Sequence, residues 1–388
     1  MENPKIRFKG FTKDWEQRKL GDVFEQTSNL VNPKEDEIEL WSLTVEDGLT
    51  KKSDRYNREF LVKKDDNFKE VRPGDIVYNP MNMTLGAVGY NGMAKSVAVS
   101  GYYTTMVAKE NYDTYYINTW LKSPQAIRLY RTYATGSLIE KQRVQFPTLS
   151  IIPVTFPKYE EQIKIGSYFH SIDNLITLHQ RKCEQTKKLK KYMLQKMFPQ
   201  NGAKVPEIRF DGFTYDWEQR KLGELGTVQT CKRIFKDQTS EKGDIPFFKN
   251  GTIGLKPDSY ISREMYEEFR RLYPYPEVGD TLISVVGSIG RTAEYTGKDE
   301  YFQDSNVVWL KTDGSINKKF LKISYQVIKW LIEGSTVKHL YNDNILRSEI
   351  VMPVSQIEQA KIAEFFEELD HLITLHQRQH KLHLNMHL

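Results

Sequence analysis

The chain has 388 residues, of which 39% are hydrophobic and 28% are charged, a globular balance in a length that suits two domains. This composition excludes a disordered or collagen-like chain, and no run of about 20 apolar residues predicts a transmembrane helix. Cys183 and Cys231 are too few for a disulfide framework, and the first residues lack the apolar core of a signal peptide. We therefore expect a soluble cytoplasmic protein.

The net charge of +5 is concentrated in one segment. Residues 181–198 hold seven lysines and arginines and one glutamate, so this segment carries +6 and the rest of the chain −1. Any surface that binds nucleic acid must therefore be formed locally. The lysines of this segment are expected to face DNA, an acidic partner or solvent.

An internal repeat is the strongest feature of the sequence. Residues 4–21 and 206–223 are identical at 15 of 18 positions, with a constant offset of 202. Residues 161–181 and 358–378 form a second matching pair, at an offset of 197, and share the unchanged run Leu-Ile-Thr-Leu-His-Gln-Arg. The chain is therefore two copies of one unit.

The two middles, residues 22–160 and 224–357, hardly match. Constant ends indicate a shared scaffold or partner, whereas variable middles indicate two different targets. The alternative is a duplicated domain whose sequence diverges without constraint. Such divergence would not leave the two ends nearly identical while the middles change.

In chain order, the middles show both strand and helix signals. The segments 74–79 and 279–286 start with Gly-Asp and continue as short apolar strands. The segments 114–134 and 317–334 have helical periodicity. The fold class is therefore α+β: two mixed globular domains, not a doubly wound parallel sheet.

Each closing constant end predicts a long helix. In residues 158–198 the apolar positions recur in alternating steps of four and three, which is the seam of a coiled coil, over a length of about 60 Å at 1.5 Å per residue. We expect two such helices to pack as an antiparallel pair; the alternative is two unrelated surface helices. The seam residues are Ile165, Phe169, Ile172 and Ile176 in the first helix and Ile362, Phe366, Leu369 and Ile373 in the second.

Histidines continue the second seam at positions 376, 380, 383 and 387. They fit either a metal-binding stripe or an altered end of a shortened helix, and we assign no metal site. Enzyme motifs are absent from the sequence. The Asn-Pro-Met-Asn run at 79–82 lacks the second proline and the aromatic of an adenine methyltransferase turn, and no glycine-rich cofactor loop, P-loop, zinc motif or nucleophile elbow is present. We therefore assign no catalytic residue.

The repeated GFT-x-DWEQRKLG openings, the Gly-Asp strands and the closing helices at 161–181 and 358–378 resemble the DNA-specificity subunit of type I restriction-modification enzymes over nearly the whole chain. The resemblance implies a non-catalytic subunit whose two target recognition domains each read one half of a bipartite double-stranded DNA site. It also implies two methyltransferase subunits and two motor-nuclease restriction subunits as partners. S-adenosylmethionine, ATP and Mg²⁺ would be bound by those partners and not by this chain. Two rival functions are a stand-alone DNA-modifying enzyme and a coiled-coil adaptor with no DNA role.

The predicted division has four parts. They are a first target recognition domain (1–156), a central spacer helix (157–201), a second target recognition domain (202–353) and a shortened C-terminal spacer helix (354–388). Trp15 and Trp217 are expected to anchor each domain onto the helices, with Leu20 and Leu222 packed beneath.

Candidate DNA-binding residues are basic, amide, hydroxyl and aromatic side chains in predicted loops. In the first middle they are Lys51, Lys52, Arg55, Arg58, Asn79, Asn82, Thr84, Tyr102, Tyr103, Thr104, Ser137, Lys141 and Arg143. In the second middle they are Lys249, Asn250, Thr252, Ser284, Ser288, Arg291, Gln303, Asp304, Asn306, Tyr341, Asn342, Asn344 and Arg347. The alternative for each is a solvated loop residue or a turn former.

Overall fold

The computed structural model describes residues 4–45, 48–51, 67–136, 142–287, 289–334 and 338–387. The chain divides into two compact units, residues 1–179 with 379–388, and residues 180–378. Each unit therefore includes a part of both long helices, and the division falls inside the helices rather than at their ends.

The described elements of the first half of the chain run from β1 to α5. They are β1 (Glu16–Lys19), α1 (Leu20–Val23), β2 (Phe24–Thr27), β3 (Leu30–Val31), β4 (Trp41–Thr44), β5 (Gly48–Lys51), β6 (Phe68–Val71), β7 (Ile76–Tyr78), the 3₁₀ turn η2 (Met83–Leu85), β8 (Val88–Tyr90), β9 (Val97–Ser100), β10 (Thr104–Ala108), α2 (Thr114–Leu121), α3 (Pro124–Tyr133), α4 (Phe146–Ser150), β11 (Pro153–Phe156) and α5 (Tyr159–Lys196).

The second half runs from β12 to α9. Its elements are β12 (Glu218–Lys221), η4 (Leu222–Glu224), β13 (Gly226–Thr230), η5 (Lys236–Gln238), β14 (Ile245–Phe248), β15 (Ser259–Ile261), α6 (Arg263–Leu272), β16 (Thr281–Ser284), β17 (Thr292–Glu294), β18 (Tyr301–Phe302), β19 (Val307–Thr312), α7 (Lys318–Ser324), α8 (Asn342–Arg347), β20 (Glu349–Met352) and α9 (Gln356–His387).

The two units contain the same main sheet although their middles hardly match in sequence. The strand order is β2-β10-β7-β8 in the first unit and β13-β19-β16-β17 in the second, with antiparallel neighbours throughout. A two-stranded ribbon joins each opening to the segment before its long helix, β1 with β11 and β12 with β20. Among the described strands only β14 and β18 pair in parallel, so the predicted α+β class is confirmed.

The predicted helix over residues 114–134 is two helices, because Ser123 caps the second one and Pro124 occupies its first turn. The predicted helix over 317–334 is wrong beyond Ser324. The chain there tightens into a turn in which the amide of Gln326 donates to the carbonyl of Ile323, and Glu333 then pairs with His339 as a β-bridge.

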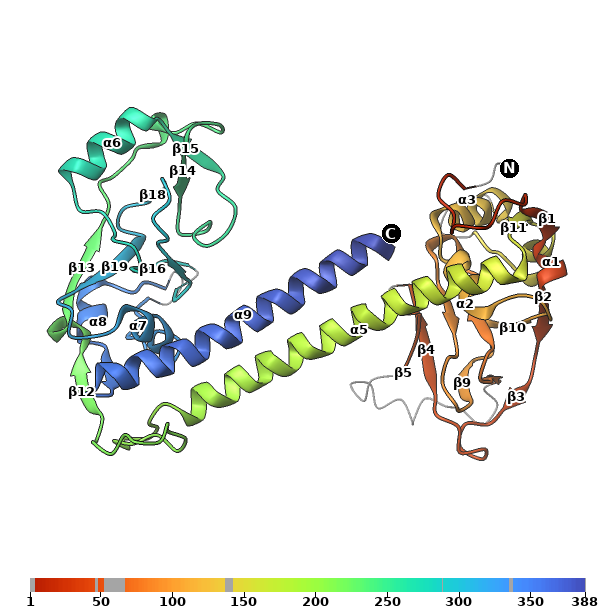
Figure 1. Ribbon diagram of the computed structural model, residues 1–388, viewed down its shortest axis with the longest axis horizontal. Helices are drawn as coiled ribbons and strands as arrows, with labels where there is room; N and C mark the ends of the chain where they lie inside the picture. Colours follow the sequence, from red (N-terminus) through yellow and green to blue (C-terminus); the bar gives the residue numbers. More distant parts are fainter. Residues whose placement is uncertain are drawn as a thin grey trace. The chain divides into compact units, whose positions relative to one another are not determined.

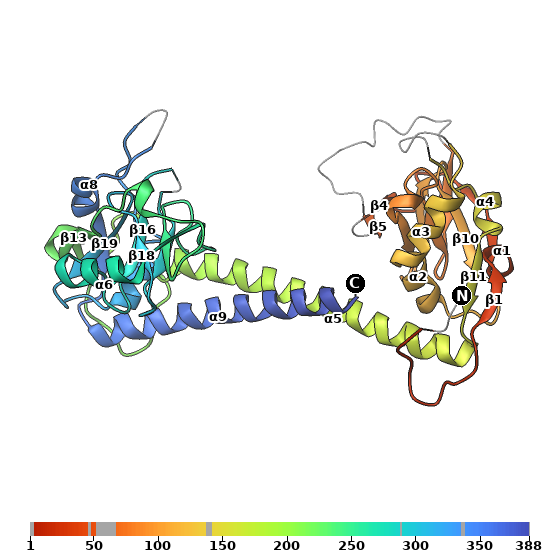
Figure 2. The same cartoon turned by 90° about the horizontal axis from the view of Figure 1, so that it is seen from above.

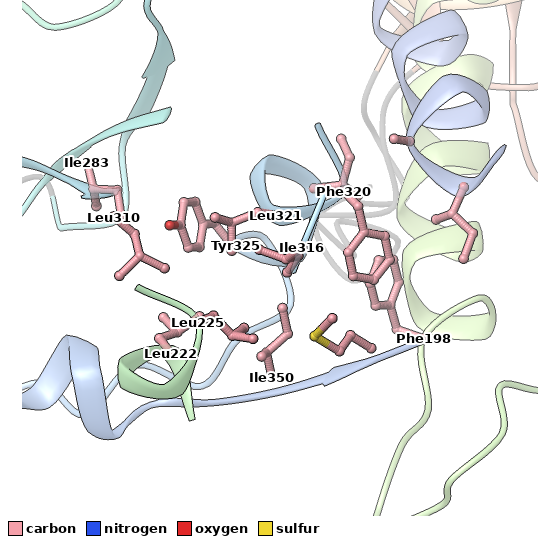
Figure 3. Packing of buried hydrophobic residues seen from close by; sticks show 14 of the residues in the cluster. Phe198, Leu222, Leu225, Ile283, Leu310, Ile316, Phe320, Leu321, Tyr325 and Ile350 are labelled. Atoms are coloured by element: carbon pink, nitrogen blue, oxygen red, sulfur yellow. The ribbon is translucent and has the colours of Figure 1, made fainter. Parts of the chain in front are cut away.

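The core of the second unit lies between the main sheet, α7 and the long helices. Ile283 and Leu310 project from β16 and β19, Phe320 comes from α7, and Phe198 follows α5 (Figure 3). All four are buried. The long helices therefore form part of the hydrophobic core and are not detached from it.

A buried ion pair fastens each constant opening to its long helix. Arg209 donates from Nε to Glu358 Oε1 at 2.7 Å and from Nη2 to Oε2 at 2.9 Å. Arg7 and Glu161 make the same forked pair at 2.9 and 2.6 Å. The glutamates are only 2% and 3% exposed, and hydrogen bonding to Glu358 raises the pKa of Arg209 above its usual value.

The neighbouring glutamine extends this contact into each middle. Gln359 donates to the carbonyl of Pro353 and accepts from the amide of Asn317, the residue that caps α7. Gln162 joins Pro157 to Asp113, the cap of α2, in the same way. In the second unit Trp217 also donates to Glu358 at 3.1 Å, so the predicted anchoring by this tryptophan is confirmed.

Within the second unit, α5 and α9 run side by side in opposite directions in both views (Figures 1 and 2). Cys183 contacts the carbonyl of Ile373, and Lys190 pairs with Asp370 at 2.7 Å. The eight predicted seam residues are all buried or partly buried, whereas most of their helix neighbours are exposed. Ile165 packs on the core of the first unit, and Ile362, Phe366 and Leu369 lie in the core of the second unit, so the domains account for the burial of these four residues. The helices themselves meet at Cys183 with Ile373 and at Lys190 with Asp370, so Lys190 serves the helix pair instead of a free surface.

The histidines of α9 follow the same seam. His376, His380 and His383 are partly buried, and His383 stacks on His179 with ring centres 5.4 Å apart. In the described part of the chain, no group of three or more side chains is arranged to hold a metal ion. None of the helices described is both long and apolar enough to cross a membrane.

The buried ion pair makes a direct prediction for stability. Replacing Arg209 with Met leaves the Glu358 carboxylate buried without its cation, and we expect the free energy of unfolding of the second unit to fall by about 3 kcal/mol. The measurement is urea unfolding followed by circular dichroism. Arg18→Met is the matched control, because Arg18 pairs with Glu16 at an exposed site and its loss should change stability by no more than about 0.5 kcal/mol. Equal losses in the two variants would contradict the assignment.

Candidate nucleic-acid interface

Three predicted loops of the second middle meet around residues 284–287 and Arg291. The side chain of Asn250 donates to the carbonyl of Val286 at 3.1 Å, and Arg291 donates to the carbonyl of Gly251 at 2.8 Å. The carbonyl of Asn306 accepts from the amide of Val285. Loops separated by up to 56 residues in the sequence therefore form one surface at the end of β16.

The fourth predicted loop joins the same surface. The amide of Leu340 donates to the carbonyl of Val285 at 2.9 Å, directly after the bridge between Glu333 and His339. The ring of His339 stacks on Tyr341 with centroids 5.5 Å apart, and Tyr341 is 53% exposed. An exposed tyrosine held by a stacked, partly buried histidine is suited to packing against sugars or bases.

The first unit repeats this arrangement with other residues. The amide of Val144 donates to the carbonyl of Pro80 at 2.9 Å, directly after a bridge between Thr135 and Arg143. Arg131, on α3, donates to the carbonyl of Thr84 at 3.2 Å. The loop that follows β7 therefore corresponds to the loop that follows β16. We name these surfaces the first and second loop clusters; their described segments are 79–86 with 131–136 and 142–144, and 284–287 with 249–251, 303–306 and 338–347.

Four predicted DNA-binding residues are buried, and for them the prediction is wrong. Thr84 and Thr104 lie inside the first unit, and Ser284 is fully enclosed and donates to the carbonyl of Val286. Asn344 donates to Glu333 at 2.7 Å. The side chains of Ser284 and Asn344 make hydrogen bonds that hold their loops. A polar residue that holds a turn has the same sequence pattern as one that reads a base.

Other predicted residues are accessible but occupied. Lys249 pairs with Asp258 at 3.1 Å, and this hydrogen bond lowers the pKa of the Asp258 carboxyl. Asp304 pairs with Arg233, and Gln303 accepts from the backbone of Asn250. Further residues with occupied side chains are Lys51, paired with Glu39; Thr252 and Asn79, which accept in turns; and Arg291, described above. Tyr103 and Asn306 are partly buried and accept through their backbone carbonyls.

Exposed side chains predicted from the sequence remain at both clusters. They are Asn82 and Arg143 in the first and Tyr341, Asn342 and Arg347 in the second, and Arg347 lies 3.8 Å from Asp343. Tyr102 is also exposed but lies outside the segments of the first loop cluster. Lys52, Arg55, Arg58, Ser137, Lys141 and Ser288 lie outside the described residues. The sequence analysis did not select Arg131 or His339, which the structure places at the clusters. The basic face of its helix could have indicated Arg131, and the nearby Tyr341 could have indicated His339.

The structure therefore defines an internally duplicated protein with two loop-built surfaces suited to nucleic acid, each on the same sheet framework. A family model described as the type I restriction modification DNA specificity domain matches residues 12–188 and again residues 215–385. The chain belongs to this family of type I restriction-modification specificity proteins, and the resemblance drawn from the repeated ends is confirmed.

Three relatives illustrate the likeness. A putative type I restriction enzyme specificity subunit of Haemophilus influenzae is 46% identical over 158 residues, which is 40% of this chain and 41% of that protein. The MjaVIII specificity subunit of Methanocaldococcus jannaschii is 23% identical over 84% of this chain and 80% of its own length. The crystal structure of a type I S subunit from M. genitalium has the same fold, with a TM-score of 0.65 at 15% identity over 99% of this chain and 96% of that one.

The second loop cluster gives a prediction for DNA binding. Tyr341→Ala and Arg347→Ala should each weaken binding of specific DNA about tenfold or more, because base stacking and phosphate pairing each contribute on the order of 1–3 kcal/mol. The measurement is a gel shift at physiological salt with the assembled complex. Arg271→Ala, the same loss of charge at an exposed position of α6, is the control. Equal effects of the three substitutions would show that only net charge matters.

Proposed function

We propose that this chain is the DNA-reading subunit of a type I restriction-modification complex and that each unit reads one half of a bipartite site. The observation that carries the proposal is the repetition of one framework with different exposed side chains. The loop after β7 and the loop after β16 are held by equivalent backbone hydrogen bonds, Val144 to Pro80 and Leu340 to Val285.

The exposed chemistry of the two loop clusters differs. The first presents Asn82, Arg131 and Arg143, whereas the second presents Tyr341 and Arg347 with other polar groups. Amide and guanidinium groups recognise base edges in the major groove, and a stacked tyrosine packs on sugars or bases. Two unequal sets of side chains would therefore select two unequal half-sites.

Members of this family work together with DNA and with other restriction-modification subunits. We propose two methyltransferase subunits and two motor-nuclease subunits as the partners, directed by this chain to adenine methylation and DNA cleavage. S-adenosylmethionine, ATP and Mg²⁺ are expected on those partners. Binding of S-adenosylmethionine to the isolated chain would favour a stand-alone enzyme instead.

Exchange of the middles tests which part of the chain reads DNA. Replacing residues 224–352 with residues 22–156 should convert the recognised site into two copies of the first half-site. The contact between Gln359 and the cap of the grafted α2 must be kept. In the native first unit Gly166 of α5 lies against this cap, and a Cβ there would lie 2.2 Å from Asp113 Oδ1. The corresponding residue of α9 is Ala363, so the graft also requires Ala363→Gly.

The readout is genome-wide mapping of N6-methyladenine in a host that carries the hybrid with its partner subunits. The hybrid that keeps Ala363 is the matched control and should assemble poorly because of the clash. Methylation at the original site by a folded hybrid would show that the middles do not determine specificity.

The helix pair makes a separate prediction about spacing. We propose that the length of α5 and α9 sets the number of base pairs between the half-sites. Inserting seven residues after Glu184 and seven after Leu372 keeps the Cys183–Ile373 contact on one side of the insertions and the Lys190–Asp370 pair on the other, so the seam is preserved on both sides. The added length of about 10 Å should lengthen the unread gap by roughly three base pairs.

The same methylation map measures this gap. Insertion into α5 alone is the control, because it breaks the register of the pair and should abolish methylation. An unchanged gap with the double insertion would refute a spacing role for the helices.

A further inference from the structure

A small pocket of the first unit lies between β8, α2 and α5 and shares no residue with the first loop cluster. Its volume is about 190 Å³, and the side chains that line it include Tyr90, Tyr115, Asn118, His170 and Asp173. Sites for whole small molecules usually have roughly 300–1,000 Å³. The pocket is therefore suited to a group of the size of one side chain.

Three aromatic rings line this pocket. Tyr115 stacks on His170 with ring centres 4.0 Å apart, and Tyr90 meets Tyr115 in a T-shaped contact at 5.7 Å. Burial raises the pKa of Tyr90, so its phenol stays neutral. The electron-rich faces of tyrosine rings attract cations, so the rings favour a positively charged ligand.

The pocket also offers hydrogen-bond acceptors. The Oδ1 atom of Asn118 is buried and accepts no hydrogen bond from any described residue. A buried acceptor without a donor is destabilising, and the last torsion of asparagine is soft enough to turn this oxygen toward a donor in the pocket. Asp173 adds a carboxylate. Burial lowers the pKa of the neighbouring Lys122, and the charge of Asp173 opposes that shift.

The second unit has cations of its own at the corresponding place. Lys319 and Lys322 of α7 correspond to Tyr115 and Asn118 of α2 when both helices are counted from their caps. The ammonium group of Lys319 lies 2.8 Å from a carboxylate of α9, and that of Lys322 lies 2.7 Å from a carboxylate of β17. These two lysines therefore join α7 to the long helix and to the main sheet.

The first unit has neither member of these two ion pairs. The carboxylates of the second unit belong to Glu367 and Glu294, and the corresponding residues of the first unit are His170 and Tyr90. Asp173, in contrast, has an aspartate at the corresponding position of α9. The first unit thus keeps a carboxylate and has aromatic rings where the second unit has internal lysines and their partners.

We propose that this pocket binds the guanidinium group of an arginine side chain from a partner polypeptide. A guanidinium group has only N–H donors and no acceptor, which matches Asn118 Oδ1 and the carboxylate of Asp173. It is planar and weakly hydrated, so it packs on the rings of Tyr90 and Tyr115 more readily than an ammonium group does. The bound arginine takes the place that internal lysines have in the second unit. The partner rests on the proposed assembly with other subunits, whereas the binding of guanidinium does not.

The first test titrates the full chain with Nα-acetyl-arginine methylamide. The matched control is the citrulline analogue, which has nearly the same shape and no charge. Saturation-transfer NMR detects weak binding from the signals of the probe itself. The arginine probe should bind about tenfold more tightly than the citrulline probe, as expected for a cation held by aromatic rings and a carboxylate. Equal binding of the two probes would overturn the proposal.

Three variants locate the binding. Asp173→Asn keeps the shape of the pocket and should weaken the arginine probe about tenfold with no change for the citrulline probe. Lys122→Met removes a competing cation and should tighten the arginine probe about threefold, an effect that a loss of folding cannot imitate. Tyr90→Glu with Asn118→Lys, the double variant, recreates the ion pair of Lys322 and should abolish binding, with thermal unfolding to verify the fold. Unchanged affinity in all three would show that the probe binds elsewhere, and the proposal would be wrong.

The assembled complex tests whether the arginine comes from a partner. Co-elution in gel filtration first verifies that the partner subunits are bound. In that complex the native chain and the double variant should give the same weak probe signal, because the partner side chain already fills the native pocket. A difference as large as in the free chain, in a complex that still methylates DNA, would rule out an arginine from a partner. That result would leave the proposed function intact.

Discussion

The forked ion pair between an arginine of each opening and a buried glutamate of each long helix is the constraint on which the rest of the structure depends. Arg7 with Glu161 and Arg209 with Glu358 join segments about 150 residues apart. A buried carboxylate is costly unless its cation and hydrogen bonds are in place, so neither partner can change by itself. The adjacent glutamines extend the contact to the caps of α2 and α7. This interdependence gives a physical reason why the ends of the two repeats are nearly identical.

The same constraint leaves the middles free to vary. Once the ribbon, the capped helix and the long helix are fixed together, the main sheet needs only its strand order and an apolar interior. The two sheets share that order with little sequence identity. The loops at the sheet ends are held by backbone hydrogen bonds, such as Leu340 to Val285, which do not depend on side-chain type. Side chains on these loops can therefore change without loss of the framework, as a protein with two different targets requires.

The two copies are nevertheless not equivalent as surfaces. The ion pair forms in both, and among the described residues the helix end that carries Met197 and Phe198 packs on the second opening. Burial of apolar side chains is contributed by neighbours that can lie anywhere in the chain or in another chain. Identical openings therefore differ in exposure, as the contrast between Ile6 and Ile208 shows.

The sequence by itself determined the duplication, the α+β class, the family and the two long helices, because repeats and periodicity are local properties of the chain. It also located the loops that form the clusters. Only the tertiary structure decided that Thr84, Ser284 and Asn344 are buried, that α7 ends at Ser324 and that Arg209 binds Glu358. Each of these outcomes depends on hydrogen bonds or packing between segments distant in the sequence. A polar residue in a loop has the same local pattern whether it supports the loop or faces a ligand.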